Sequence, residues 1–295
     1  MSHIKEKGMK VVFLIAACTS VLAVVLICIF LFANGIPTIA EIGPLKFLFG
    51  TEWKPSNDKY GIFPMIVASI YVTGGSILVG VPIAIFTSVF MARYCPKKIY
   101  GFLKSGIELM AGIPSIVYGF FGLVLLVPLI RDLFGGPGAS MLAAILLLAI
   151  MILPTIVGVT ESAIRSVPES YYEGSLALGA TKERSIFAVT LPAAKSGILA
   201  GVVLGIGRAI GETMAVVMIA GNQARMPKGL LKGVRTMTMN IVTDMGYATG
   251  LHRQALIATA VVLFVFILII NLSLSLLNRR SEHERERSRK HRHEK

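Results

Sequence analysis

Six long apolar stretches, separated by shorter polar segments, dominate the pattern of hydrophobic and polar positions along the chain. Each stretch is close to or above the roughly 20 residues that an α-helix needs to cross a bilayer. The pattern therefore predicts an all-α integral membrane protein with about six transmembrane helices. The predicted spans are residues 11–33, 62–92, 109–130, 141–159, 198–221 and 255–277.

The first apolar stretch has an alternative interpretation as a cleaved signal peptide. Such a peptide has an apolar region of about 7–15 residues, followed by a cleavage site with small residues. Residues 11–33 are 23 residues without a charge, and the sequence from Phe30 to Asn34 matches such a cleavage site poorly. We therefore predict a retained first helix.

Composition supports the membrane interpretation. Hydrophobic residues make up 55% of the chain and charged residues 15%, and the mean hydropathy is +0.75. Soluble domains usually carry about a quarter charged residues, so this chain lacks the polar surface of a soluble protein of its size. Two of its three cysteines, Cys18 and Cys28, lie ten residues apart in the first helix, beyond the reach of a disulfide. We predict no metal site.

The net charge of +13 is explained by membrane topology rather than by nucleic-acid binding. Eight Lys and Arg residues lie in 279–295, and the interleaved aromatic residues of a single-strand binding surface are absent. With both termini inside, the inner segments carry nineteen Lys and Arg residues and the outer segments nine, which predicts an N-in/C-in topology. The basic outer stretch 222–254 departs from this rule, so it either faces an anionic species outside or contradicts the topology.

The inner polar region 161–197 contains a segment with turn signals at fixed positions. Gly179 is a predicted helix stop, and Pro192 is predicted to break a second short helix at the preceding residue. Two short helices across the inner face would form a docking surface. An ordinary interfacial helix pair is the alternative.

The same segment resembles the signature of ATP-binding-cassette (ABC) importer permeases. In that signature a Glu is followed by two small residues, by a Gly six positions later, and by Leu-Pro at positions 18 and 19. The matching residues here are Glu173, Gly174, Ser175, Gly179, Leu191 and Pro192. The resemblance implies that this loop docks on a separate cytoplasmic ATPase.

Two ionisable residues, Arg208 and Glu212, lie within the fifth apolar stretch. Charged groups at membrane depth are costly and usually face a bundle interior or a water-filled path. Their spacing of four predicts that they share one helix face and neutralise each other. They are candidates for a substrate pathway, and a purely structural ion pair is the alternative. Gly201, Gly205 and Ala209 form a ridge of small residues, which predicts a central, closely packed helix.

Further segments are similar to the phosphate-specific subgroup of these permeases, and to its C-type subunit rather than to the A-type partner. These segments are residues 108–119, 152–156, 177–181 and 207–216. The resemblance implies a type I-like permease bundle in the cytoplasmic (inner) membrane of a bacterial or archaeal cell. It also implies a heterodimer with an A-type permease, two cytoplasmic ATPase subunits and an external phosphate-binding protein.

The predicted organisation has three parts: a first helix with an outer connector (1–61), a permease transmembrane domain (62–278) and a basic, disordered tail (279–295). No phosphate-binding G-x-x-x-x-G-K-[ST] motif occurs. We therefore expect a transporter subunit without catalytic residues or a bound cofactor. ATP-Mg is expected to be bound and hydrolysed by the partner ATPase. Two alternatives need no ATPase partner: a self-contained ion-coupled transporter or channel for an oxyanion, with Arg208 and Glu212 as a relay, and a membrane scaffold that only signals phosphate status.

Overall fold

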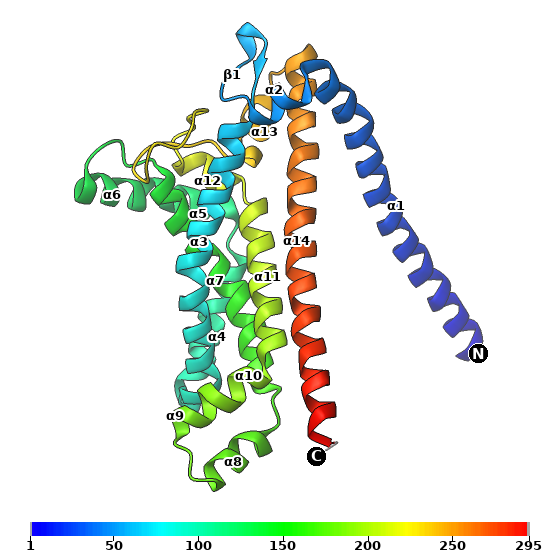
Figure 1. Cartoon of the computed structure of the whole chain (residues 1–295), viewed down its shortest axis with the longest axis vertical. Helices are drawn as coiled ribbons and strands as arrows, with labels where there is room; N and C mark the ends of the chain where they lie inside the picture. The colour runs from blue at the N-terminus through cyan, green and yellow to red at the C-terminus, as the bar shows by residue number, and fades with distance from the viewer. Residues whose placement is uncertain (1, 294–295) are drawn as a thin grey trace.

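The computed structural model describes the backbone of residues 2–293 and the side chains of residues 6–273 (Figure 1). The helices and strands, in chain order, are α1 (Ser2–Ile42), α2 (Pro44–Phe49), β1 (Trp53–Lys54), β2 (Lys59–Tyr60), α3 (Phe63–Val89), α4 (Lys97–Gly112), α5 (Ser115–Phe121), α6 (Val127–Phe134), α7 (Met141–Arg165), α8 (Glu169–Ala177), α9 (Lys182–Ser185), α10 (Leu191–Ala193), α11 (Lys195–Gly211), α12 (Met214–Ile219), α13 (Met237–Met245) and α14 (Gly250–His293). A short 3₁₀ turn, η1 (Pro55–Asn57), and three π-helical turns, η2 (Phe90–Tyr94), η3 (Gly122–Leu126) and η4 (Ile186–Thr190), complete the described elements.

The prediction of about six transmembrane helices is confirmed. Five helical segments of the described chain are long and apolar enough to cross a bilayer, and a sixth results if one pair of helices bent by 70° is counted as one span. The five segments are Glu6–Ile42, Phe63–Tyr94, Ser115–Phe134, Met141–Arg165 and Gly250–Ser273, and the bent pair is Lys182–Ala193 with Lys195–Gly211.

The centre of the bundle is α7, against which α3 and α11 pack. The predicted ridge of small residues on α11 makes this contact. A side-chain carbon at Gly201 would lie 3.0 Å from the hydroxyl of Thr160, and one at Gly205 would lie 2.6 Å from Ile156. A side chain at either position would force its neighbour on α7 to move, so the two glycines permit the close approach of the helices. The central place predicted for this helix is confirmed.

Helix α1 is peripheral and meets the bundle only through its outer half. It contacts α14, where the rings of Phe32 and Phe264 lie 5.8 Å apart and Gly35 packs against Val261. Figure 1 shows α1 leaning away from the other helices toward its N-terminal end. The apolar side chains of its inner half are exposed in the isolated chain, as expected for a helix surrounded by lipid.

The segments that precede and follow the spans separate into two ends of the molecule. Figure 1 shows α8 and α9 at the end where α1 begins and α14 finishes, and the hairpin β1–β2 and α13 at the opposite end. This placement agrees with an even number of crossings. It also puts the basic stretch 222–254 opposite the candidate docking loop. The helix α14 extends into the tail 279–295, where side chains lie outside the described residues, and disorder of this tail stays a prediction.

The topology predicts which engineered cysteines are reachable from outside the cell. In a background without Cys18, Cys28 and Cys95, Lys228→Cys and Lys232→Cys should react with an impermeant maleimide in intact cells, because both lysines are exposed at the outer end. Lys195→Cys, exposed at the opposite end, is the matched control and should react only after the inner side is opened. The reverse pattern would contradict the topology.

Each of the three π-turns ends two residues before a proline: Pro96, Pro128 and Pro192. In each turn the residue just before the proline donates its N–H to a carbonyl five positions back, as Cys95 does to Phe90 and Leu191 does to Ile186. Proline lacks an N–H, and its ring clashes with the carbonyl four residues earlier. A wider turn moves that carbonyl aside, so the chain stays helical past Pro128 and Pro192, whereas α3 ends before Pro96, where Cys95 is extended with ψ 124°.

The prediction that Pro192 breaks the second inner helix at the preceding residue is therefore wrong. Leu191 is helical, with φ −64° and ψ −44°. The chain remains helical from Lys182 to Ala193, and the 70° bend follows at Ala194.

Candidate functional site

The candidate docking segment is formed by α8, the turn at Gly179 and α9. Gly179 has φ +84°, a left-handed conformation that costs a residue with a side chain about 1–2 kcal/mol. The predicted helix stop is therefore confirmed. Leu178, which precedes the turn, is 90% exposed, and Glu173 and Gly174 are also exposed. The segment therefore exposes the apolar side chain of Leu178 and the carboxylate of Glu173 at the inner end of the molecule.

Hydroxyl contacts give this segment its shape. Ser185 donates to the hydroxyl of Ser175 at 3.0 Å, which joins α9 to α8. The hydroxyl of Thr181 accepts from the N–H of Arg184 and caps the start of α9. The Ser175 hydroxyl therefore orders the segment, whereas Glu173 is exposed and has no hydrogen bond or ion pair among the described residues, so its carboxylate can contact a partner.

Arg208 is held by a neighbouring helix rather than by Glu212. Its Nη1 atom donates to the hydroxyl of Thr155 on α7 at 3.0 Å. Arg208 is only partly buried, and the space beside Gly207, one residue earlier, contains no atom within 4 Å of an added side-chain carbon. The isolated chain therefore covers Arg208 only in part.

The predicted pairing of Arg208 with Glu212 is wrong for this conformation. The helix α11 ends at Gly211, and Glu212 has an extended backbone with ψ 129°. Its Oε1 atom accepts from the N–H groups of Thr213 and Ala215 at 3.1 and 3.2 Å. No ion pair joins the two residues in the part of the chain that the structure describes. The prediction from a spacing of four residues failed because α11 ends before Glu212, and the Glu212 carboxylate accepts hydrogen bonds at the start of the next helix instead.

A small polar cavity borders Glu212 between α3, α7, α11 and the stretch before α13. Its volume is about 10 Å³, close to the size that one water molecule requires. Four hydroxyl side chains contribute to its lining: Ser69, Thr73, Thr236 and Thr238. Glu212 thus lies at a polar position within the bundle, but this conformation has no room there for an oxyanion.

Sequence reasoning missed a charged cluster around Glu161 at the inner end of the bundle. Glu161 is 3% exposed, pairs with Arg165, lies 3.8 Å from Lys104 and accepts from Tyr100 at 2.8 Å. The guanidinium of Arg165 also lies over the Tyr100 ring. The cluster fixes α4 to α7. The spacing of four between Glu161 and Arg165 was visible in the sequence, but α4 is brought alongside only by the fold.

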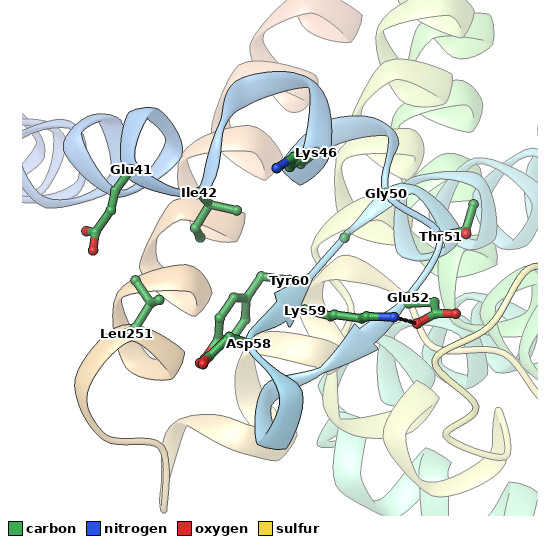
Figure 2. Close-up of a pocket in the computed structure, with 11 residues that line it drawn as sticks. Glu41, Ile42, Lys46, Gly50, Thr51, Glu52, Asp58, Lys59, Tyr60 and Leu251 are labelled. Atoms are coloured by element: carbon green, nitrogen blue, oxygen red, sulfur yellow. Dashed lines mark hydrogen bonds and ion pairs between the residues drawn. The ribbon is translucent and has the colours of Figure 1, made fainter.

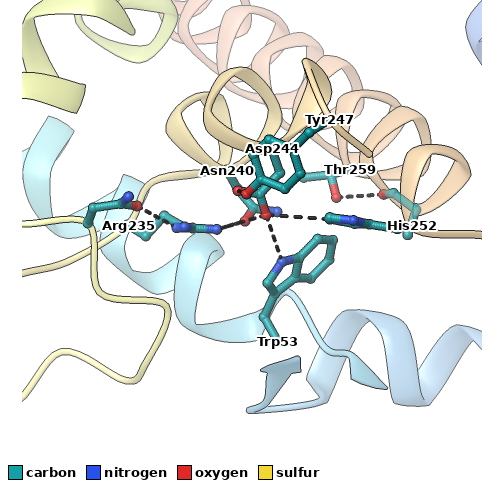
Figure 3. Close-up of polar contacts among 9 residues, drawn as sticks. Trp53, Arg235, Asn240, Asp244, Tyr247, His252 and Thr259 are labelled. Carbon is teal, nitrogen blue, oxygen red and sulfur yellow. Dashed lines mark hydrogen bonds and ion pairs between the residues drawn. The ribbon is translucent and has the colours of Figure 1, made fainter. Parts of the chain in front are cut away.

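A second missed cluster surrounds Asp244 at the outer end (Figure 3). Arg235 and His252 approach the carboxylate from opposite sides, at 3.1 and 3.4 Å, and Trp53 and Tyr247 donate hydrogen bonds to it. Burial raises the pKa of Asp244, but the Tyr247 hydrogen bond, the Arg235 charge and the Trp53 hydrogen bond lower it by more. The pKa therefore lies below its usual value, and the carboxylate's contribution to stability is lost only as pH falls through that lowered value.

This outer cluster changes the interpretation of the basic stretch 222–254. Arg235 is neutralised by Asp244 and also donates to Asn222 and Asn240. Part of the positive charge of this stretch therefore holds the segment before α13 against α13, and Asp244 connects α13 to α14 and the hairpin through His252 and Trp53. Lys228 and Lys232 are exposed, and no ion pair of theirs is present among the described residues.

The outer end also carries an open cleft of about 530 Å³ between the end of α1, the hairpin and the start of α14 (Figure 2). Its charged lining is mixed: Glu41, Lys46, Glu52, Asp58 and Lys59. Glu52 and Lys59 form an ion pair at 2.7 Å across the hairpin, and the hydrogen bond and charge of Lys59 lower the pKa of Glu52. With both signs of charge present, this cleft has no preference for an oxyanion.

Comparison with known proteins gives consistent matches. Residues 80–283 match the family model described as "Binding-protein-dependent transport system inner membrane component". A probable ABC transporter permease protein, YqgH, of Bacillus subtilis is 40% identical over 243 residues, which cover 80% of this chain and 79% of that protein. The phosphate transport system permease protein PstC of Xylella fastidiosa is 35% identical over 244 residues, which cover 76% and 75% of the two chains.

Solved structures with the same arrangement of helices include two ABC transporters. A bacterial alginate transporter aligns with a TM-score of 0.63 at 18% identity, covering 93% of this chain and 96% of that one. The MetNI methionine transporter aligns with a TM-score of 0.58 at 21% identity, covering 72% and 93%. At these identities the likeness concerns the fold.

Proposed function

Because the chain belongs to the family of binding-protein-dependent transport system inner membrane components, we propose that it is the phosphate-translocating permease subunit of an ABC importer. The family consists of membrane subunits that work with a binding protein and a separate ATPase, so the chain is a transporter component and not an enzyme. The assignment of phosphate as the substrate rests on similarity to several proteins named as PstC phosphate transport permeases. They are 32–35% identical to this chain over about three quarters of each chain.

The chemistry of the candidate pathway supports an anionic substrate. Arg208 keeps its charge and presents a planar fork that suits an oxyanion. Its position on α11, beside the central helix α7, places the charge within the bundle. Within the isolated chain its described acceptor is a neutral hydroxyl, which leaves the positive charge available.

The same surroundings support a second permease subunit. A charged group at membrane depth is costly unless another protein surface or water covers it. Arg208 is partly exposed, Gly211 is exposed, and a side-chain carbon added at Gly207 would meet no described atom within 4 Å beyond its own helix. We propose that an A-type permease covers this side, and that two cytoplasmic ATPase subunits and an external phosphate-binding protein complete the complex in the cytoplasmic membrane. ATP-Mg would be bound by the ATPase subunits only.

The test is uptake of labelled phosphate by proteoliposomes that contain the complete complex. We expect uptake to require the binding protein and ATP, and unlabelled phosphate to compete better than sulfate. A complex with a hydrolysis-deficient ATPase is the control and should take up no phosphate. Undiminished uptake in that control would support the ion-coupled transporter instead, and uptake of another oxyanion but not phosphate would contradict the substrate.

A further inference from the structure

The inner end of α3 finishes in the π-turn η2, and three other helices hold this turn. Arg165 at the end of α7 donates its Nη2 atom to the carbonyl of Met91 at 2.9 Å. Glu169 at the start of α8 pairs with Arg93 at 2.7 Å. From α9, the Lys182 ammonium lies 4.7 Å from the centre of the Tyr94 ring. One five-residue turn therefore contacts a central membrane helix and both helices of the docking segment.

The π-turn itself creates one of these contacts. In an α-helix the N–H of Cys95 would bond to the carbonyl of Met91, four residues earlier. Here that N–H bonds instead to Phe90, five residues earlier, at 2.8 Å. The carbonyl of Met91 is left without a helical donor, and Arg165 supplies one. The wider turn thus exchanges a bond within α3 for a bond to α7.

The side chain of Arg93 has its described partners on α8 and none on its own helix. The Arg93 side chain is 11% exposed, and its described partners are the Glu169 carboxylate and the Tyr172 ring, which lies 5.6 Å away, both on α8. Its Nε atom is buried and donates no hydrogen bond to the described residues. The buried guanidinium at the end of α3 is therefore positioned by the docking helix rather than by its own helix.

We propose that η2 is the relay through which a displacement of the docking segment reaches the membrane helix α3, with Arg93 and Glu169 as its positioning pair. This inference rests on the proposed function, because it assigns the segment from α8 to α9 to an ATPase contact. The pair itself adds little to stability, since Glu169 is 58% exposed and such pairs are screened by water. Its role is to keep α8 and the end of α3 at a fixed distance while both move.

Coupling between the docking segment and α3 should depend on the ion pair between Arg93 and Glu169, in either orientation, and not on the identity of either residue alone. In the reconstituted complex, Arg93→Gln and Glu169→Gln should each lower the binding-protein-stimulated ATPase rate by roughly fivefold, with normal assembly. The double variant Arg93→Glu with Glu169→Arg should recover most of the stimulation. Glu52→Gln breaks an exposed pair with the same 2.7 Å separation at the outer end and, as the matched control, should have no effect.

A second readout does not depend on the transported ion. Cys95 directly follows η2 and is partly exposed. In a variant without Cys18 and Cys28, trapping the ATPase with ATP and vanadate should change the alkylation rate of Cys95. We expect the change in the otherwise unaltered complex and the charge-swapped variant, and its loss in either single variant.

The outcomes distinguish a failure of the relay from a failure of the proposed phosphate transport. Single variants that keep the ATPase stimulation and the Cys95 response would overturn the relay, as would a charge swap that is no better than the single changes. A Cys95 response without phosphate uptake would contradict the proposed substrate and leave the relay intact. An otherwise unaltered complex with no Cys95 response would also overturn the relay.

Discussion

Replacing Arg208 by glutamine is expected to lower phosphate uptake by roughly ten- to hundredfold, because a charged hydrogen-bond partner of the anion is lost. The complex should assemble normally, since Arg208 is only partly buried and its described hydrogen bond goes to the hydroxyl of Thr155. The measurement is uptake of labelled phosphate, normalised to the amount of complex in the membrane.

Matched variants distinguish this role from a structural one. Arg208→Lys keeps the charge but not the planar fork, so we expect intermediate uptake. Thr155→Val preserves volume and removes the hydroxyl that holds the guanidinium, so it should weaken uptake less than Arg208→Gln. If Arg208→Gln transports phosphate at the normal rate, Arg208 is no part of the pathway.

Replacing Glu212 by glutamine tests whether its negative charge, rather than its hydrogen bonds, is needed for phosphate uptake. Glutamine keeps an oxygen that can accept from Thr213 and Ala215, so Glu212→Gln should preserve the local fold. A fall in uptake in this variant would then report the lost charge. Because the two side chains do not pair in this conformation, combining Glu212→Gln with Arg208→Gln should not restore uptake. Restored uptake in the double variant would instead assign the two residues to a structural pair.

Replacing Gly179 by proline is expected to abolish binding-protein-stimulated ATPase activity while leaving the helices inserted. Proline fixes φ near −65°, whereas Gly179 has φ +84°, so the turn between α8 and α9 cannot form. An added side-chain carbon at Gly179 meets no atom within 4 Å. The cost is therefore in the backbone alone, and Gly179→Ala should show a smaller loss of about 1–2 kcal/mol in turn stability.

Gly174→Ala is the matched control for this prediction. Gly174 lies inside α8, is exposed and has open space around it. Alanine favours a helix over glycine by about 1 kcal/mol, so this variant should keep the stimulation. Glu173→Lys reverses an exposed charge and should uncouple the ATPase if the carboxylate meets it. Normal stimulation in both Gly179→Pro and Glu173→Lys would remove the docking role.

The membrane spans and the turn at Gly179 could be predicted from the sequence because both depend on local properties. Long apolar stretches determine where helices cross a bilayer, and a glycine at a helix end allows a left-handed conformation. The ridge of Gly201 and Gly205 was informative for a similar reason, since small residues permit close approach to any neighbouring helix.

The charge pairs could not be predicted because they depend on which helices become neighbours. Arg208 and Glu212 have the spacing of a helical pair, but α11 ends between them and each side chain finds another partner. Glu161 joins Tyr100 and Lys104 of a different helix. Asp244 pairs with Arg235 and His252 from within nine residues of the chain, and it also accepts a hydrogen bond from the distant Trp53. Such contacts follow from the tertiary fold rather than from spacing.

The three π-turns have a consequence for comparing this chain with its relatives. A π-turn contains one more residue than the α-helical turn it replaces, so the side chains beyond it are rotated by about 100° around the helix axis. Deleting one residue from Gly122–Leu126 or Ile186–Thr190 would turn the helix face that follows away from its neighbours, and it would bring the proline ring back against the carbonyl four residues earlier. A one-residue gap in an alignment at these places would therefore signal a rotated helix face rather than a shortened loop.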